Sequence, residues 1–167
     1  GSEHTIDGKK FTAECHFVHF AARFSGIDEA VASGQMGALS VVGLLLDIVP
    51  GSKSTGNAEL TRVLNTATTL PKRTPSLKTE VEIAAFDPRS MLPLDKRRGT
   101  ELLSYFHYNG SLTTPPCTEI VRWYVLREPA EITQEQLELF RSFSHIAPLA
   151  NGSLPVSFRV DSNNRPV

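Results

Sequence analysis

Hydrophobic and polar residues alternate along much of the first forty-nine positions, in short runs separated by glycine-containing turns. Runs of this kind are typical of β-strands, and the pattern predicts strands over 3–7, 11–20 and 38–49. The longest apolar run, residues 37–46, is about half the length that a membrane-spanning helix requires. It therefore predicts a buried strand.

The rest of the chain mixes extended segments with short helices. Residues 57–68 carry leucine and valine at helical spacing behind Asn57, which is a suitable N-cap. Residues 133–143 predict a second helix and open with a sequence close to a capping box. Two extended runs within 104–126 flank a glycine and a Pro-Pro pair, and 79–86 is strand-like. The expected fold class is mainly β, with a few short helices on the surface.

Composition limits the classes of function without selecting one. A chain of 167 residues with 40% hydrophobic content can build one globular core. A net charge of −1 gives no electrostatic reason to expect nucleic acid or an anionic membrane as a partner. The opening residues, GSEHTIDGKK, lack the apolar core of a signal peptide, and no membrane span is predicted.

The stretch ECHFVHF, residues 14–20, concentrates side chains that can bind metals. On a helix, His16 and His19 would share a face and could hold one ion together. On a strand they would point to opposite faces. The aromatic and valine content favours a strand, which places Glu14, His16 and Val18 on one face. At most one of the two histidines then serves any given site.

A lone histidine on a strand is more often a core residue than a metal ligand, but Glu14 changes this balance. A carboxylate two positions from His16 can accept the second ring N–H of a metal-bound imidazole. A buried strand seldom tolerates such a carboxylate without a partner. A further acid, Glu3, stands beside His4 near the start of the chain. The pattern suggests a metal site that includes His16.

The stretch YNGSLTTPPCTEIVRW, residues 108–123, closely resembles the signature of the α-class carbonic anhydrases. Residues 1–20 resemble the segment of that family that carries the third zinc-binding histidine. Three further segments match in the family's order: ALSVVGLLLDI, FDPRSMLP and NRPV. The resemblance covers essentially the whole chain, 1–167, as one partial domain. It implies a large, mostly antiparallel twisted sheet with short surface helices.

The resemblance also implies roles for individual residues. His16 is similar to the third zinc ligand, and Glu14 to the acid that orients it. Thr113 resembles the gatekeeper threonine, whose hydroxyl donates to the carboxylate matching Glu3. Thr114 resembles the neighbouring active-site threonine. The apolar wall where carbon dioxide rests in the family corresponds to Val18, Val41, Leu112 and Trp123.

The implied activity is the reversible hydration of carbon dioxide to bicarbonate and a proton by zinc-bound hydroxide. The implied cofactor is Zn²⁺, which lowers the pKa of its bound water, a property for which carbonic anhydrase itself is the standard example. Carbon dioxide and bicarbonate are the expected small-molecule partners. An apolar pocket suits carbon dioxide, because that molecule offers almost no polarity to a binding site.

One departure from the family pattern is large. The family's first two zinc ligands form a His-x-His pair on a strand just upstream of the segment that matches Gly1. The sequence also stops at Val167, before the family's last core segment. The chain thus resembles the C-terminal two-thirds of the domain, truncated at both ends. It is either an incomplete record of an enzyme or a catalytically silent module for protein or matrix contacts, and the retained Glu3 and Thr113 favour the first.

Location is inferred from the cysteines and from two glycosylation motifs. Cys117 matches a position that secreted relatives use for a disulfide with a cysteine near the N-terminus, so the resemblance implies secretion, with a cytoplasmic location as the alternative. Cys15 is expected to be a packed thiol. Asn109 and Asn151 lie in NGS motifs, and Asn151 is the better acceptor because a glycan on Asn109 would crowd the site.

Overall fold

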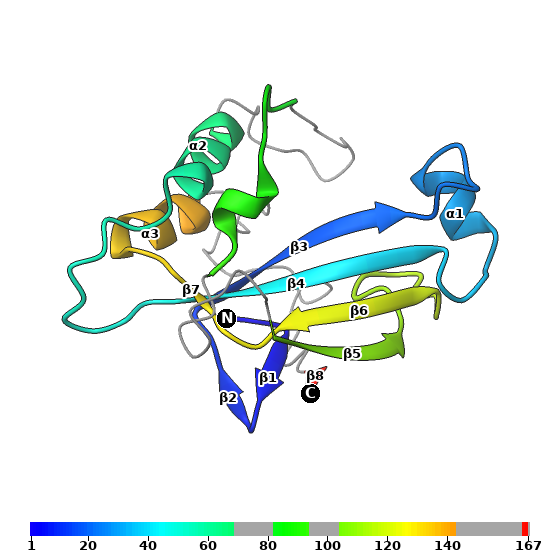
Figure 1. Cartoon of the computed structure of the whole chain (residues 1–167), viewed down its shortest axis with the longest axis horizontal. Helices are drawn as coiled ribbons and strands as arrows, with labels where there is room; N and C mark the ends of the chain where they lie inside the picture. The colour runs from blue at the N-terminus through cyan, green and yellow to red at the C-terminus, as the bar shows by residue number, and fades with distance from the viewer. Residues whose placement is uncertain (69–81, 94–103, 143–164, 167) are drawn as a thin grey trace, which may run out of the picture. The chain divides into compact units, whose positions relative to one another are not determined.

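The computed structural model describes residues 1–68, 82–93, 104–142 and 165–166 (Figure 1). The chain divides into two compact units. The first, here called the sheet unit, comprises Gly1–Asp47, Pro93–Ala130 and Asn163–Val167. The second, the helical unit, comprises Ile48–Leu92 and Glu131–Ser162.

The sheet unit contains two sheets. The smaller has the strand order β2-β1-β8, with the bounds β1 His4–Ile6, β2 Lys9–Lys10 and β8 Arg165–Pro166. The larger has the order β3-β4-β6-β5, and β7 pairs with β4 outside this path. Its strands are β3 Ala13–Phe20, β4 Leu39–Asp47, β5 Tyr105–Gly110, β6 Val121–Leu126 and β7 Ala130–Glu131. The mainly β class is thus confirmed.

The larger sheet is mixed, because β4 and β6 run parallel while β3–β4 and β5–β6 are antiparallel pairs. Its centre is buried, as predicted for the apolar run of β4, in which Leu44 and Leu45 are fully buried. The short helix α1 (Ile27–Ala32) connects β3 to β4 and buries Ala30 in the same core. The sequence pattern had not indicated this helix.

The described part of the helical unit contains three short helices: α2 Ala58–Ala67, the 3₁₀ helix η1 Pro88–Met91 and α3 Gln134–Ser142. Asn57 caps α2, and its side-chain oxygen accepts a hydrogen bond from the Leu60 N–H at 2.9 Å. At the start of α3, the Gln136 N–H donates to Thr133 Oγ1 at 3.2 Å, and the Thr133 N–H donates back to Gln136 Oε1 at 3.1 Å. Both predicted caps are confirmed.

Gln136 also joins the two helices of this unit. Its side chain is buried, its Nε2 donates to the Asn57 carbonyl at 2.7 Å and to Thr61 Oγ1 at 2.8 Å, and its Oε1 accepts from the Asn57 N–H at 3.4 Å. Gly56 has a φ of +75° and lies so close that an added Cβ would overlap the Gln136 amide. The amide therefore has all its hydrogen-bonding groups satisfied by nearby protein atoms.

The prediction of a strand over 79–86 is wrong for residues 82–86, the part of this range that the structure describes. Residues 82–86 hold no strand, and Ala84 and Ala85 form a turn, with a φ of 51° at Ala85. The Arg62 guanidinium donates to the Ala84 carbonyl at 2.7 Å and to the Ala85 carbonyl at 3.1 Å. These carbonyls are thus satisfied by a side chain instead of a neighbouring strand.

Among the described residues, the helices are too short or too polar for any of them to cross a membrane. The segment 151–164 and the adjacent basic residues Lys96, Arg97 and Arg98 lie outside the described residues.

Candidate metal centre

One face of the larger sheet carries several of the side chains that the sequence singled out. Residues paired directly on neighbouring strands project from the same face. The register pairs Val18 with Val41, and Val41 with Trp123. Trp123 in turn pairs with Tyr108. His16 lies two positions before Val18 on β3, so its imidazole projects from this same face, as predicted for a strand.

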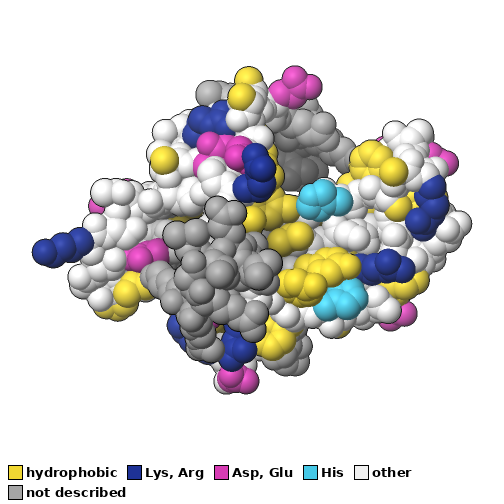
Figure 2. Space-filling model, in the orientation of Figure 1, with side chains coloured by type: hydrophobic (Ala, Val, Ile, Leu, Met, Phe, Trp, Pro, Cys, Tyr) yellow, Lys and Arg dark blue, Asp and Glu magenta, His cyan; other side chains and the backbone are white. Residues whose placement is uncertain are grey.

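The opposite face carries histidines that are unrelated to this cluster. His19 is exposed and pairs with Ser40. It is adjacent to Val18 on β3, so its side chain projects from the opposite face. His107 is also exposed, stacks on Tyr124 with ring centroids 4.5 Å apart, and places Nδ1 2.8 Å from the Trp123 carbonyl oxygen. Figure 2 shows histidine side chains next to hydrophobic ones on one face of the molecule. His16 and His19 thus cannot serve one site.

The Glu14 carboxylate is the centre of the cluster. Its Oε1 accepts hydrogen bonds from His16 Nε2 at 2.7 Å and from His4 Nδ1 at 2.6 Å. Its Oε2 accepts from the backbone N–H of Glu3 at 2.9 Å and of His4 at 2.8 Å. The side chain is only 3% exposed. Four donors therefore compensate a carboxylate that is almost removed from water.

These donors decide the charge of Glu14. Burial alone would raise the pKa of its carboxyl group, but the hydrogen bonds from His16 and His4 and the electrostatic attraction of His4 outweigh burial and hold the pKa well below its usual range. Glu14 is therefore ionised near neutral pH and can only accept hydrogen bonds. That constraint fixes which nitrogen of each neighbouring ring carries the proton.

The proton positions separate a ligand from a framework residue. His16 donates through Nε2, so the lone pair of its neutral ring is on Nδ1, the atom left to bind a metal. His4 donates through Nδ1, and its Nε2 lies 2.6 Å from the Tyr108 hydroxyl. Its side chain is fully buried. Although His4, Glu14 and His16 place ligand-type atoms within 4.8 Å of one another, both nitrogens of His4 are already engaged.

Trp123 holds both imidazoles in place. It is 2% exposed, and its ring contacts those of His4 and His16 edge-on, each with centroids 4.9 Å away. Tyr108 lies parallel to Trp123 at an interplanar angle of 9°. A Cβ on Gly110 would come within 2.8 Å of the Tyr108 ring, so a larger residue there would displace the tyrosine.

A glycine in β4 makes room for the carboxylate. Gly43 pairs with His16 across the β3–β4 register, and a Cβ at this position would lie 3.1 Å from Glu14 Oε1. Such a contact is closer than ordinary van der Waals separation. Neither Gly43 nor Tyr108 was predicted from the sequence to belong to the site. The period-2 alternation would have placed Tyr108 on the face of Trp123, but no local signal marks Gly43.

The structure places the other predicted site residues as follows. Glu3 Oε2 lies 3.9 Å from His16 Nε2, and the Glu3 side chain is 30% exposed, so this acid stands beside the cluster. Thr113 is half-buried and Thr114 is exposed, both in the loop between β5 and β6. The hydrogen bond expected between Thr113 and Glu3 stays a prediction.

This loop is fastened to the sheet beneath it. Trp123 Nε1 donates to the Ser111 carbonyl at 3.1 Å, and the Leu112 N–H donates to the Thr118 carbonyl at 3.0 Å. Leu112 is partly buried against the core cluster that includes Trp123. The predicted apolar residues of the loop and of the sheet are therefore brought together in one place.

The two cysteines are both free in the structure. Cys15 is half-buried, and burial together with the charge of Glu14 raises the pKa of its thiol to about 11. It has the character expected of a packed thiol. Cys117 is exposed. Its disulfide with a cysteine outside this sequence stays a prediction.

Contrary to the expectation from the sequence, a glycan on Asn109 would not crowd the site. Asn109 is exposed and adjoins Tyr108 on β5, so the two side chains project from opposite faces of the strand. A glycan on Asn109 would leave the face of Trp123 and His16 clear. Asn151 lies outside the described residues, and glycosylation of either asparagine stays a prediction.

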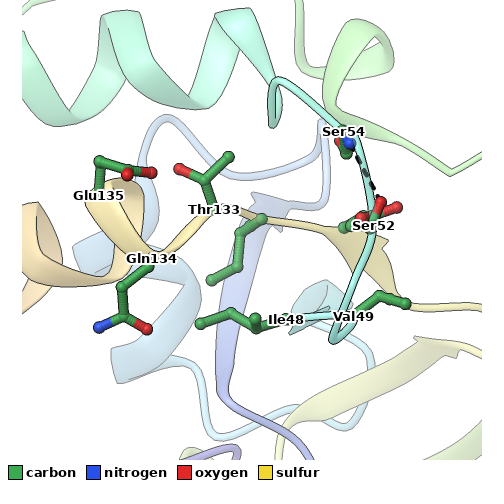
Figure 3. Close-up of a pocket in the computed structure, with 9 residues that line it drawn as sticks. Ile48, Val49, Ser52, Ser54, Thr133, Gln134 and Glu135 are labelled. Carbon is green, nitrogen blue, oxygen red and sulfur yellow. Dashed lines mark hydrogen bonds between the residues drawn. The ribbon is translucent and has the colours of Figure 1, made fainter.

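A pocket lies within the helical unit (Figure 3). It has a volume of about 220 Å³, with an apolar side at Ile48 and Val49. The Ser54 N–H donates to Ser52 Oγ at its rim, at 3.1 Å. Its nine lining residues include no histidine or cysteine, so it lacks the donor set of the cluster around Glu14.

Comparison with known proteins decides the family. Residues 1–167 match the family model described as eukaryotic-type carbonic anhydrase. The chain belongs to the eukaryotic-type carbonic anhydrases. It is 38% identical over 143 residues to carbonic anhydrase 7 of Mus musculus, covering 85% of this chain and 47% of that protein. It is 34% identical over 181 residues to mitochondrial carbonic anhydrase 5B of Homo sapiens, covering 96% and 50%.

A third relative, putative carbonic anhydrase 3 of Caenorhabditis elegans, is 38% identical over 146 residues, covering 87% of this chain and 49% of that protein. The chain thus spans about half the length of the curated relatives it matches. The family resemblance found in the sequence is confirmed, and the mainly β fold agrees with it.

Proposed function

We propose that this carbonic anhydrase chain contributes to a zinc-dependent enzyme that reversibly hydrates carbon dioxide to bicarbonate and a proton. The observation that carries the proposal is the 2.7 Å hydrogen bond from His16 Nε2 to Glu14 Oε1. It orients the imidazole and leaves the Nδ1 lone pair free to bind a metal. This is the arrangement of a metal-bound histidine. Family membership supports the same chemistry.

The donor chemistry of the cluster fits zinc, which binds neutral imidazole nitrogen. His16 would hold the ion through Nδ1, and Glu14 would keep that ring in the required tautomer. When bound, the zinc ion supplies the acidity that lets a water molecule lose its proton near neutral pH. Neither β4 nor β6 would supply the remaining ligands, because the row of His16 continues with Gly43 and Val125, whose side chains cannot bind a metal.

A strand lying along the outer side of β3 is the natural source of those ligands, since β3 is the end strand in the order of the larger sheet. The expected His-x-His pair would suit this position, because residues two apart on a strand share a face. With His16 they would make a three-histidine set, for which carbonic anhydrase is the standard example.

The substrate would lie over the row of apolar side chains. Val18 is 48% exposed at the end of this row, whereas Val41 is buried. With Leu112 and Trp123 they would form a wall for carbon dioxide, which needs little polar recognition. The Thr113 hydroxyl, donating to Glu3, would orient the attacking oxygen. The Thr113 N–H and the Thr114 hydroxyl would donate to the product oxygens.

For location, the prediction of secretion gains no support from the relatives. Two of them, the human and mouse forms of carbonic anhydrase 5B, are described as mitochondrial. Cys117 is free in the structure. We therefore retain the alternative of a location inside the cell. Fractionation of cells that express the tagged native product would test it, and recovery from the medium would restore the secreted form.

The proposed activity is tested by zinc content and carbon dioxide hydration, measured on the 167-residue chain and on the longest native product that contains it. The variant His16→Asn removes the proposed donor, and His19→Asn is its matched control on the opposite face. We expect the native product to bind one zinc ion and to be active, His16→Asn to lose both properties, and His19→Asn to keep them.

A native product that stays free of zinc and inert under these conditions would refute the proposal. The retained cluster would then be scaffold, and the alternative of a catalytically silent module for protein or matrix contacts would replace the enzyme.

A further inference from the structure

Two imidazoles compete for one carboxylate oxygen in the metal centre. Glu14 Oε1 accepts from His16 at 2.7 Å and from His4 at 2.6 Å, while the other oxygen is occupied by two backbone N–H groups. Hydrogen bonds to an ionised group draw on its charge. A stronger donation from His4 therefore leaves less negative charge for His16.

The hydrogen bond from His4 to Glu14 is strengthened by a second hydrogen bond on the other nitrogen of the His4 ring. In the neutral form of His4, the Nδ1 proton is donated to a carboxylate that can only accept, and this leaves Nε2 as an acceptor. The Tyr108 hydroxyl, 2.6 Å away, is then the donor to that nitrogen. A donor on one ring nitrogen polarises the imidazole and strengthens donation from the other, as hydrogen bonds in a chain reinforce one another.

The packing keeps the Tyr108 hydroxyl at this position. The tyrosine ring lies parallel to Trp123 and edge-on to His4, with centroid separations of 6.2 and 5.8 Å. The side of the ring facing Gly110 has no room for a Cβ. His4 is fully buried, so water does not compete for its Nε2. The chain of bonds from Tyr108 to His16 is therefore continuous, and its two middle members, His4 and Glu14, are buried.

We propose that Tyr108 tunes the donor strength of His16, acting through His4 on the carboxylate oxygen that both imidazoles share. In this arrangement the tyrosine moderates His16: its hydroxyl strengthens the His4–Glu14 bond, and the His16–Glu14 bond weakens in response. Tyr108 is a positioning residue, because it acts on the ligand through two other side chains. The consequence for zinc affinity rests on the proposed function, whereas the coupling between the rings does not.

The first test uses imidazole NMR of the metal-free native product, comparing Tyr108→Phe with wild type. Loss of the hydroxyl should weaken the His4–Glu14 bond and strengthen the His16–Glu14 bond. The His16 Nε2–H proton should then move downfield, while the His4 Nδ1–H proton moves upfield. The matched control is Tyr105→Phe, on the same strand but 56% exposed and on the opposite face, which should move neither signal.

The second test measures zinc affinity in competition with a chelator. Tyr108→Phe should bind zinc about threefold more tightly, a change smaller than the tenfold to hundredfold effects of groups that contact a ligand directly. Glu14→Gln should weaken binding, so the two variants should differ in sign. A merely structural role for Tyr108 would lower zinc affinity and leave the His16 proton signal in place, and that result would overturn the proposal.

A non-natural residue guards against a variant that fails to fold. Replacing Tyr108 by 3,5-difluorotyrosine keeps the ring and makes its hydroxyl a stronger donor, so the His16 proton should move upfield, opposite to Tyr108→Phe. Shifts in the same direction for both changes would refute the coupling. If no form binds zinc but the proton shifts are as expected, the coupling stands and the proposed enzyme function fails.

Discussion

Each unit of this protein has, among its described residues, a buried polar side chain that accepts or donates several hydrogen bonds, here called a hub. The two hubs differ in whether one of their partners keeps an atom free to bind a ligand. In the helical unit, the Gln136 amide bonds to Asn57, Thr61 and Thr133, all of which are occupied in capping or joining helices. In the sheet unit, the Glu14 carboxylate bonds to His16, whose second ring nitrogen remains available.

The difference separates a polar network that serves packing from one that serves chemistry. A neutral amide can satisfy itself with backbone groups at moderate cost. A buried carboxylate is much more expensive, and it is kept here with two histidines as partners. A charged hub that orients an imidazole with a free lone pair indicates a metal site, whereas a neutral hub whose bonds only join and cap neighbouring helices indicates a structural role.

The largest effect is expected from Glu14→Gln, which turns the charged hub into a neutral one. The amide would present an NH₂ group to N–H donors, so the free energy of unfolding should fall by roughly 3 kcal/mol, because buried donors lose a charged acceptor. Urea denaturation measures this change. The control Glu119→Gln alters an exposed acid in the same unit and should be nearly neutral. Equal stability of the two variants would contradict the role given to Glu14.

Gln136→Leu should break the helical unit's hub at a cost of about 2 kcal/mol, because buried backbone and hydroxyl groups lose their partner. Hydrogen exchange should quicken in α2 and α3, while the amides of β3 and β4 keep their protection. Gln134→Leu, at an exposed neighbouring position, is the matched control. Loss of protection in the sheet unit as well would show that the two hubs are not independent.

Gly43→Ala perturbs the charged hub without changing its chemistry. The added methyl would approach Glu14 Oε1 to 3.1 Å, so the free energy of unfolding should fall by about 1 kcal/mol through overpacking. Metal affinity should weaken with it. Gly26→Ala is the comparison, since a Cβ there meets nothing within 4 Å. A stabilising effect at Gly43 would mean that the carboxylate has room to move.

The smallest effect concerns Asp47, an acid in the sheet unit whose partners are not buried histidines. Burial would raise the pKa of Asp47, but hydrogen bonds from Lys9 and Thr12 and the charge of Lys9 hold that pKa below its usual value. Because the pKa is lower in the folded state, the stabilisation is present near pH 7 and is lost as the pH falls through the acid range.

The contribution of Asp47 should stay under about 1 kcal/mol, since Lys9 is 62% exposed. Unfolding free energies of wild type and Asp47→Asn, measured near pH 7 and near pH 3, should differ at the first value and converge at the second. A gap that widens in acid would reverse the sign assigned here.

The features that the sequence predicted are those with a local cause. Alternation placed Glu14 and His16 on one face of a strand, and Asn57 and the start of α3 followed the rules of helix capping. The six-residue helix α1 was missed, because a helix this short carries little periodicity.

The features that the sequence did not predict depend on residues far apart in the chain. Tyr108 meets His4 across a separation of 104 residues, and Gly43 makes room for Glu14 from a neighbouring strand. The carbonyls of Ala84 and Ala85 are bonded by Arg62, which overrides a strand-like pattern. In each case tertiary contacts, not propensity, decide the outcome.

The bond between Tyr108 and His4 also sets an order of events in folding. Glu14, His16 and His4 lie within a short stretch of chain and can meet early, whereas closing a loop of 104 residues carries a larger entropic cost. Contacts of long sequence separation slow folding. The local contacts among Glu14, His16 and His4 therefore form first, and the cluster reaches its final geometry only when Tyr108 has packed against His4.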